Sequence, residues 1–150
     1  MAQWTIQVYT QRTPNVCWEA CARMMWQWRH KSLDNYAKTA GAYANLDAGL
    51  TQWQMDAFYK ELGLRSLADG KGVNLRHALG WTPVIFTSTD QVTGHAMVLS
   101  GVNGTRYTVV NPCAVQAVDF EHDSNVCSAS TVSRTRPEVE KTLGSYIWYW

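Results

Sequence analysis

The sequence has almost no surplus of charge and no long apolar run. Lys and Arg number 13 against 12 Asp and Glu, so the formal net charge is +1 at pH 7. With no basic excess to hold phosphates, nucleic acid and membrane surfaces are poor candidates for the main partner. No stretch of about 18 apolar residues is present, so we expect no membrane-spanning helix. Internal repeats, low-complexity tracts and linkers are also absent, which predicts a single domain over residues 1–150.

The N-terminus and the cysteines bear on the compartment in which the chain is made. Residues 1–5 lack the basic and apolar regions of a secretory signal peptide, so we expect synthesis in a reducing cytoplasm without Sec export. Four cysteines are too few for a disulfide scaffold. Cys17 and Cys21 share one predicted helix face, which leaves Cys113 and Cys127 as the pair available for a structural disulfide. Whether these two form a disulfide stays open.

The most informative stretch of the chain runs from Gln11 to Trp28. Its apolar residues recur with the spacing of one helix face, at Cys17, Cys21, Met24 and Trp28. Pro14 suits a helix start, and Thr13 or Asn15 is available as the N-cap. In the first turn, the free N–H groups and the positive end of the helix dipole favour a thiolate. We therefore predict that Cys17 is a nucleophile and that Gln11 holds a developing oxyanion.

The rest of the chain gives helix signals first and strand signals afterwards. We predict a strand over Trp4 to Tyr9, a helix plus loop over Leu33 to Leu50, a helix with a Thr51 capping box that stops at Gly63, and a short helix that Asn74 caps and Gly80 ends. Later strands are predicted at Pro83 to Phe86, Gly94 to Gly101, Arg106 to Asn111, Val115 to Phe120 and Tyr146 to Trp150. Ser128 to Arg136 is polar and is expected to be a mobile loop. This order predicts an α+β fold in which the N-terminal helix packs against an antiparallel β-sheet.

His95 begins one predicted strand and Asn111 ends the next, with Asn103-Gly104 between them. A two-residue turn at Asn103-Gly104 would point the two side chains to opposite faces of the sheet. A three-residue loop over 102–104, with Gly104 left-handed, pairs 95 with 111 and brings their Cβ atoms to about 5 Å. We predict this second register. Asn111 then accepts from one imidazole nitrogen and fixes the tautomer, while the other nitrogen faces the thiol.

These blocks together carry a resemblance. A glutamine six residues before a Cys-Trp pair that opens an apolar helix, followed by Gly94-His95-Ala96 and Val110-Asn111-Pro112, resembles the papain-like cysteine peptidases. More narrowly, it is similar to their short bacterial members, the leader peptidases that process bacteriocins and the secreted avirulence proteases of plant pathogens. Many of these members carry Asp where Asn111 stands, whereas papain itself has Asn.

The resemblance implies an acyl transfer by Cys17, His95 and Asn111, with Gln11 at the oxyanion and with no cofactor or metal. It also implies a protein substrate that is cut after small residues, especially paired glycines. We expect Trp18, Trp81 and Gly94 to line the substrate groove.

Small peptidases of this kind resemble bacterial effectors or toxins. The resemblance therefore implies a monomer made in the bacterial cytoplasm, delivered by a dedicated secretion system into a target cell and restrained by a cognate immunity or inhibitor protein.

Other functions stay open at this stage. A peptidoglycan amidase would use the same Cys–His pair, although its third residue is usually His. A protein deamidase or transglutaminase would share the acyl-enzyme, and a non-catalytic binding module would use none of this chemistry. Cys21 is predicted to be a core residue. A zinc site from Cys113, His122 and Cys127 is conceivable, but it lacks a close pair of ligands.

Overall fold

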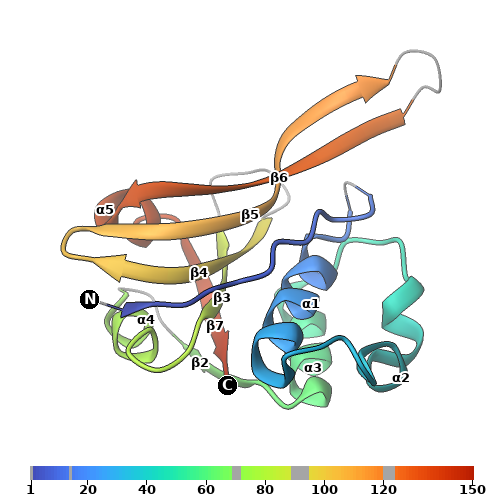
Figure 1. Ribbon diagram of the computed structural model, residues 1–150, viewed down its shortest axis with the longest axis horizontal. Helices are drawn as coiled ribbons and strands as arrows, with labels where there is room; N and C mark the ends of the chain where they lie inside the picture. Colours follow the sequence, from blue (N-terminus) through green and yellow to red (C-terminus); the bar gives the residue numbers. More distant parts are fainter. Residues whose placement is uncertain (1, 14, 69–71, 89–94, 120–123) are drawn as a thin grey trace.

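The computed structural model describes residues 2–13, 15–68, 72–88, 95–119 and 124–150 (Figure 1). Its helices are α1 Cys17–His30, α2 Tyr36–Ala40, the 3-10 helix η1 Gly41–Asn45, α3 Gln52–Leu62, α4 Val73–Ala78 and α5 Arg136–Glu140. Its strands are β1 Ala2–Gln3, β2 Arg65–Ala68, β3 Val84–Ser88, β4 His95–Asn103, β5 Arg106–Asp119, β6 Ser124–Thr135 and β7 Leu143–Tyr149. None of the helices in these ranges combines the length and the apolar character needed to span a bilayer.

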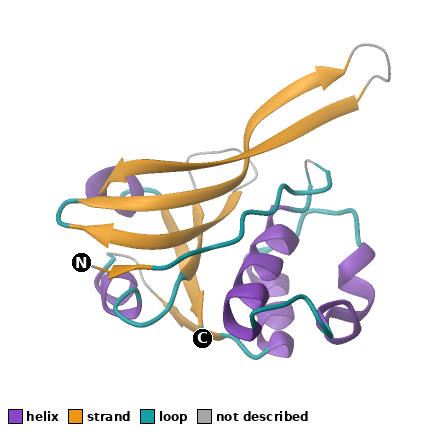
Figure 2. Cartoon of the chain, viewed as in Figure 1, coloured by secondary structure: helices purple, strands orange, loops and turns teal. Residues whose placement is uncertain are grey.

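In the described part of the chain, the strands form one antiparallel sheet in the order β2-β7-β3-β4-β5-β6, with β1 on part of the β4 edge. Helices cover both faces of this sheet (Figure 2). Ile85 and Trp148 pack with α1, α2 and α3, whereas Phe86 and Ile147 pack with α4 and α5. The predicted α+β fold, with the N-terminal helix against an antiparallel sheet, is confirmed.

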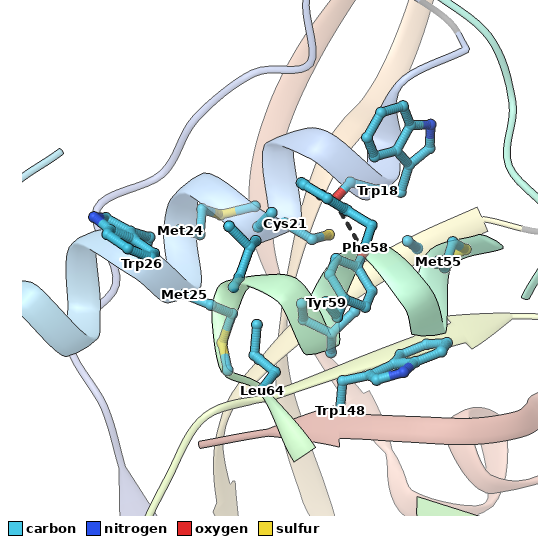
Figure 3. Close-up of a cluster of buried hydrophobic side chains, with 14 of the residues drawn as sticks. Trp18, Cys21, Met24, Met25, Trp26, Met55, Phe58, Tyr59, Leu64 and Trp148 are labelled. Atoms are coloured by element: carbon cyan, nitrogen blue, oxygen red, sulfur yellow. Dashed lines mark hydrogen bonds between the residues drawn. The ribbon is translucent and has the colours of Figure 1, made fainter. Parts of the chain in front are cut away.

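Helix α1 is held by the larger of the two cores (Figure 3). Cys21, Met24 and Met25 are fully buried in it. The Tyr59 hydroxyl donates a hydrogen bond of 2.9 Å to the Trp18 carbonyl, which ties α1 to α3. Because burying each large apolar side chain stabilises the fold by about 1.5–3 kcal/mol, the start of α1 has a fixed position relative to the sheet.

The ends of three helices test the capping predictions. Thr51 and Gln54 form the predicted capping box, and Gly63 ends α3 in the left-handed region. Before α1, Thr13 and Asn15 do not cap the helix as predicted, because both side chains bond Asp47 instead. The prediction that Asn74 caps a short helix was also wrong. Gly72, not Asn74, is the N-cap residue of α4, which ends at Ala78, and the Asn74 side chain donates to the Ala68 carbonyl.

The predicted strand over Trp4 to Tyr9 is also wrong. Strand β1 ends at Gln3, and the next residue continues along β4 through the Trp4 N–H, which donates to the Ser100 carbonyl at 2.7 Å. Beyond that point β3 occupies the same edge of β4, from Leu99 to His95. Residues 4–10 therefore have no free strand to pair with and run as an extended loop toward α1.

The connection between β4 and β5 differs from the predicted three-residue loop. Asn103 pairs with Arg106, so the turn consists of Gly104 and Thr105, with Gly104 left-handed as predicted. The register then shifts between Leu99 and Gly101, and Val98 pairs with Val110. After the shift, odd-numbered residues of β4 pair with odd-numbered residues of β5, so residues 95 and 111 lie on one face of the sheet. They are offset diagonally by two positions and not directly opposite as predicted.

The outer part of the sheet differs from the predicted pattern in two places. Residues 115–119 continue β5 and are not a separate strand, while Phe120 lies outside the described residues. Ser128 to Arg136 is not a loop, because residues 128–135 belong to β6 and pair with β5, and Arg136 begins α5. Figure 1 shows the outer parts of β5 and β6 as a ribbon that extends beyond the helices.

Candidate active site

Cys17 is the first residue of α1, so its thiol lies at the helix N-terminus, as predicted. The side chain is half-buried, and its Sγ accepts a hydrogen bond of 3.3 Å from the Ala96 backbone N–H. Ala96 directly follows His95 at the start of β4. The contact therefore brings the sulfur to the backbone that carries the imidazole.

Burial and backbone donors have opposite effects on this thiol. Burial raises the pKa of Cys17 above its ordinary value, while the N–H groups of Ala96, Trp18 and Cys17 itself lower it. The N–H groups at the helix start favour the thiolate, as predicted, but burial outweighs them, and the pKa of Cys17 is raised overall. A separate base is needed to remove the proton.

His95 and Asn111 form the second part of the candidate site. Nε2 of the buried His95 is 2.6 Å from Oδ1 of Asn111. The same Oδ1 accepts a hydrogen bond of 3.0 Å from the Cys113 backbone N–H. Because a backbone N–H only donates, it fixes which end of the amide faces it, and Oδ1 can only accept. The hydrogen between the two side chains therefore lies on Nε2, which makes Nδ1 the acceptor nitrogen of the neutral ring.

Gln11 is buried against the same region. Its backbone N–H donates to the Pro112 carbonyl at 3.2 Å, and its side-chain Nε2 donates to the Thr13 carbonyl at 2.8 Å. Its Oε1 is buried and has no hydrogen-bond partner among the described residues. A primary amide has two N–H donors, so the bond to Thr13 uses one of the two.

A buried acid that the sequence analysis did not single out supports this loop. Glu19, two residues after Cys17, is 1% exposed and pairs with Arg12 at 3.3 Å and with Arg23 at 2.8 Å. The Tyr36 hydroxyl lies 3.3 Å from its Oε2. Since Arg12 is adjacent to Gln11, the Glu19 carboxylate anchors the loop that carries the candidate oxyanion donor. The spacing of Glu19 and Arg23, four apart on one helix, was the available sequence signal.

Of the three residues expected to line the groove, the structure describes Trp18 and Trp81. Trp18 is 1% exposed, because its ring packs edge-on against Tyr43 and Phe58, so it has no surface for a substrate. Trp81 is exposed and contacts the His77 ring edge-to-face, just before β3, whereas the far end of β3 pairs with His95. Gly94 lies outside the described residues. The burial of Trp18 argues against its predicted substrate contact, and the contact of Trp81 remains a prediction.

The other cysteines also have definite positions. Cys113 and Cys127 are joined in a disulfide, so neither supplies a thiolate to the zinc site considered above, and His122 lies outside the described residues. Cys21 is fully buried in the core, as predicted, and burial raises its pKa well above the ordinary value.

A cavity of about 430 Å³ reaches the candidate site from the α5 side of the sheet. Its lining includes Asn111 and Ser88, the apolar side chains of Met97 and Val109, and the basic side chains of Arg134 and Lys141. Asn111 thus borders a space that a ligand of moderate size can enter.

Comparisons with known proteins agree with this arrangement. The family model described as papain-like cysteine protease AvrRpt2 matches residues 2–125. A crystal structure of a double glycine motif protease from an AMS/PCAT transporter, in complex with the leader peptide, has a TM-score of 0.63 and 12% identity, covering 99% of this chain and 94% of that chain. The peptidase domain of Streptococcus ComA, a bi-functional ABC transporter involved in quorum sensing, has a TM-score of 0.57 and 11% identity, with 95% of each chain covered.

At such identities these solved structures show a shared fold alone. A search of curated proteins found no match. The family model, in contrast, spans most of the chain. The chain therefore belongs to the papain-like cysteine protease AvrRpt2 family and is a papain-like cysteine peptidase.

Proposed function

We propose that the chain cleaves a protein substrate with a triad of Cys17, His95 and Asn111. The observation that carries this proposal is the 2.6 Å contact between His95 Nε2 and Asn111 Oδ1, together with the Cys17 sulfur bonded to the next backbone N–H on β4. Asn111 holds the ring with Nε2 protonated, so Nδ1 is the atom that takes the thiol proton.

The reaction follows from these positions. Nδ1 of His95 removes the proton from Cys17, and the sulfur attacks the amide carbonyl to form a C–S bond. The Gln11 side chain and the Cys17 backbone N–H stabilise the oxyanion. His95 then returns its proton to the leaving amine as the C–N bond breaks. Water, deprotonated by the same ring, releases the acyl group and regenerates the thiol.

We further propose that the peptidase prefers small residues, in particular paired glycines, before the cut. Support comes from the double glycine motif protease, which has the same fold and was solved with a leader peptide. The direct test is a series of peptides that differ only at the two residues before the cut. Cleavage should be fastest for Gly-Gly and should fall with each added side chain. Equal cleavage of Val-Val and Gly-Gly peptides would contradict this preference.

The biological role that we propose is that of a bacterial effector or toxin, delivered into a target cell and neutralised by an immunity protein. Its support is the resemblance of the Gln11 to Trp28 and Gly94 to Pro112 blocks to the secreted members of the family. Expression of the wild type and of Cys17→Ala in bacteria tests the role and the activity together. The wild type alone should slow growth and create new protein termini.

The same experiment separates peptidase activity from its chemical relatives. A deamidase acting through the same acyl-enzyme would change a protein mass by about one dalton without a new terminus. If wild type and Cys17→Ala are equally harmless and no terminus appears, the peptidase proposal loses its main support.

A further inference from the structure

We propose that the Cys113–Cys127 disulfide is a positioning element of the candidate active site, because it anchors the irregular part of β5 that orients Asn111 and Gln11. The inference rests on the proposed triad, since it concerns the same side chains.

The irregularity is a bulge between β5 and β6. Asn111 pairs with Ser130 and Val115 pairs with Ser128, so three β5 residues, 112–114, lie opposite the single β6 residue Ala129. The extra residues cannot all join the hydrogen-bond ladder, and their backbone groups turn to other partners. Pro112 suits this position because it has no N–H to lose.

The backbone groups released by the bulge contact the candidate site. The Pro112 carbonyl accepts from the Gln11 backbone N–H at 3.2 Å. The Cys113 N–H donates to Asn111 Oδ1 at 3.0 Å. On the opposite strand, the Ala129 N–H donates to the hydroxyl of Thr10, the residue before Gln11, at 3.4 Å. One bulge thus supports both the triad amide and the loop of the oxyanion donor.

The Cys113 contact has a specific chemical consequence. The two ends of an amide side chain differ little in shape, so rotation of Asn111 would present its NH₂ group to His95 in place of Oδ1. Nε2 would then have to be an acceptor, and Nδ1 would carry the hydrogen. A ring in that tautomer cannot take the Cys17 proton through Nδ1. The Cys113 N–H opposes this rotation because it requires an acceptor, and its own position depends on the bond to Cys127.

The test is alkylation of Cys17 by iodoacetamide at about pH 6, followed by peptide mapping, because this needs no substrate and reports on the thiolate. We compare the wild type, the Cys113→Ser/Cys127→Ser variant, and the wild type reduced under native conditions by a phosphine. In that reduction, the phosphine and one water molecule convert the disulfide to two thiols and a phosphine oxide. Both disulfide-free forms should react with iodoacetamide about tenfold more slowly than the oxidised wild type. This loss is part of the rate acceleration of about 10²–10⁴-fold that a positioned acid–base group supplies. Reoxidation should restore the wild-type rate.

Three controls separate positioning from stability. Leu75→Ala, which opens a cavity in the core under α4, should lower stability without slowing alkylation. Phosphine treatment of the double-serine variant should change nothing. Adding the two serine substitutions to Asn111→Ala should give no loss beyond that of Asn111→Ala alone, since the disulfide acts through the Asn111 side chain.

Two results would overturn the inference about the disulfide and leave the proposed triad standing. One is a double-serine variant that reacts as fast as the wild type. The other is a combined variant with Asn111→Ala whose loss in alkylation rate equals the product of the two separate losses. A different result would overturn the proposed triad as well. In that case Cys17 of the oxidised wild type would react no faster at about pH 6 than Cys17 of His95→Ala.

Discussion

His95 Nε2 and Asn111 Oδ1 lie 2.6 Å apart even though their residues are diagonal neighbours and not a cross-strand pair. Diagonal neighbours are farther apart than directly paired residues, but an imidazole and an amide side chain are long enough to reach each other across this distance. The register shift between Leu99 and Gly101 makes this possible, because without it the two side chains would point to opposite faces.

The first prediction concerns the Asn111 side chain. Asn111→Ala should reduce kcat by about 10²-fold, because the His95 ring loses the acceptor that selects its tautomer. KM for a Gly-Gly peptide should change much less. Steady-state kinetics with such a peptide provide the measurement.

Asn111→Asp is the matched control for this change, since it keeps an acceptor oxygen in the same place. It should retain most of the activity. The added negative charge favours imidazolium and raises the pKa of His95, so the basic limb of the pH–rate profile should move to higher pH. An Asp variant as inactive as the Ala variant would argue against a hydrogen-bonding role.

The second prediction follows from the raised pKa of Cys17. In His95→Ala no base remains, so the rate of alkylation should rise only at pH values above the ordinary thiol range of about 8.5. The raised pKa of Cys17 also makes stability depend on pH. The fold favours the neutral thiol, so Cys17 has no destabilising effect below the ordinary thiol range, and the free energy of unfolding decreases as the pH rises above it. Alkylation rates and urea midpoints across pH measure both effects, and a Cys17 of His95→Ala that ionises below the ordinary range would contradict the assignment.

The third prediction concerns the oxyanion. Gln11→Ala should lower kcat by about 10²–10³-fold, the usual cost of one oxyanion donor. Alkylation of Cys17 should remain near the wild-type rate, because iodoacetamide forms no tetrahedral oxyanion. Gln7→Ala, on the exposed part of the same loop, should leave both rates unchanged. If Gln11→Ala slows alkylation and turnover equally, the side chain is a support for the thiol and not an oxyanion donor.

The fourth prediction concerns the buried carboxylate of Glu19. Glu19→Gln keeps the shape but leaves Arg12 and Arg23 without their counter-charge. Both arginines are about one-third exposed, so water offsets part of the loss, and we expect a decrease in the free energy of unfolding of about 1–3 kcal/mol. Urea denaturation measures this difference. Glu61→Gln on the exposed face of α3 should cost less than about 0.5 kcal/mol, and a similar small cost for Glu19→Gln would show that the pairs add little.

The parts of the fold that the sequence predicted well are those with local signals. Helix α1 has an apolar period, so its presence could be predicted, and α3 has both a capping box and a terminal glycine, so its boundaries could be predicted as well. Strand β6 has neither signal. Its residues from Ser128 to Thr135 are mostly polar because they form a ribbon with β5 at the edge of the sheet, and polar residues in series also describe a loop.

The candidate site shows the same division. Cys17 and Gln11 were predicted from a local motif, and their surroundings were not. Burial raises the Cys17 pKa and the Ala96 N–H lowers it, and Ala96 is far from Cys17 in the sequence. Trp18 was assigned to a groove because it is next to the thiol, but successive helix residues point in different directions, and its ring faces α3. The bulge at 112–114 depends on its pairing with β6, which no local pattern specifies.

The position of β7 has a consequence for synthesis in the cell. This strand lies between β2 and β3 and supplies the fully buried Ile147 and Trp148, although it follows both of them in the sequence. A nascent chain that stops before residue 143 has β2 and β3 without their shared neighbour, so the sheet that carries His95 can close only after this strand has been made. A nascent chain that has not yet reached β7 should therefore be inert toward the proteins around it.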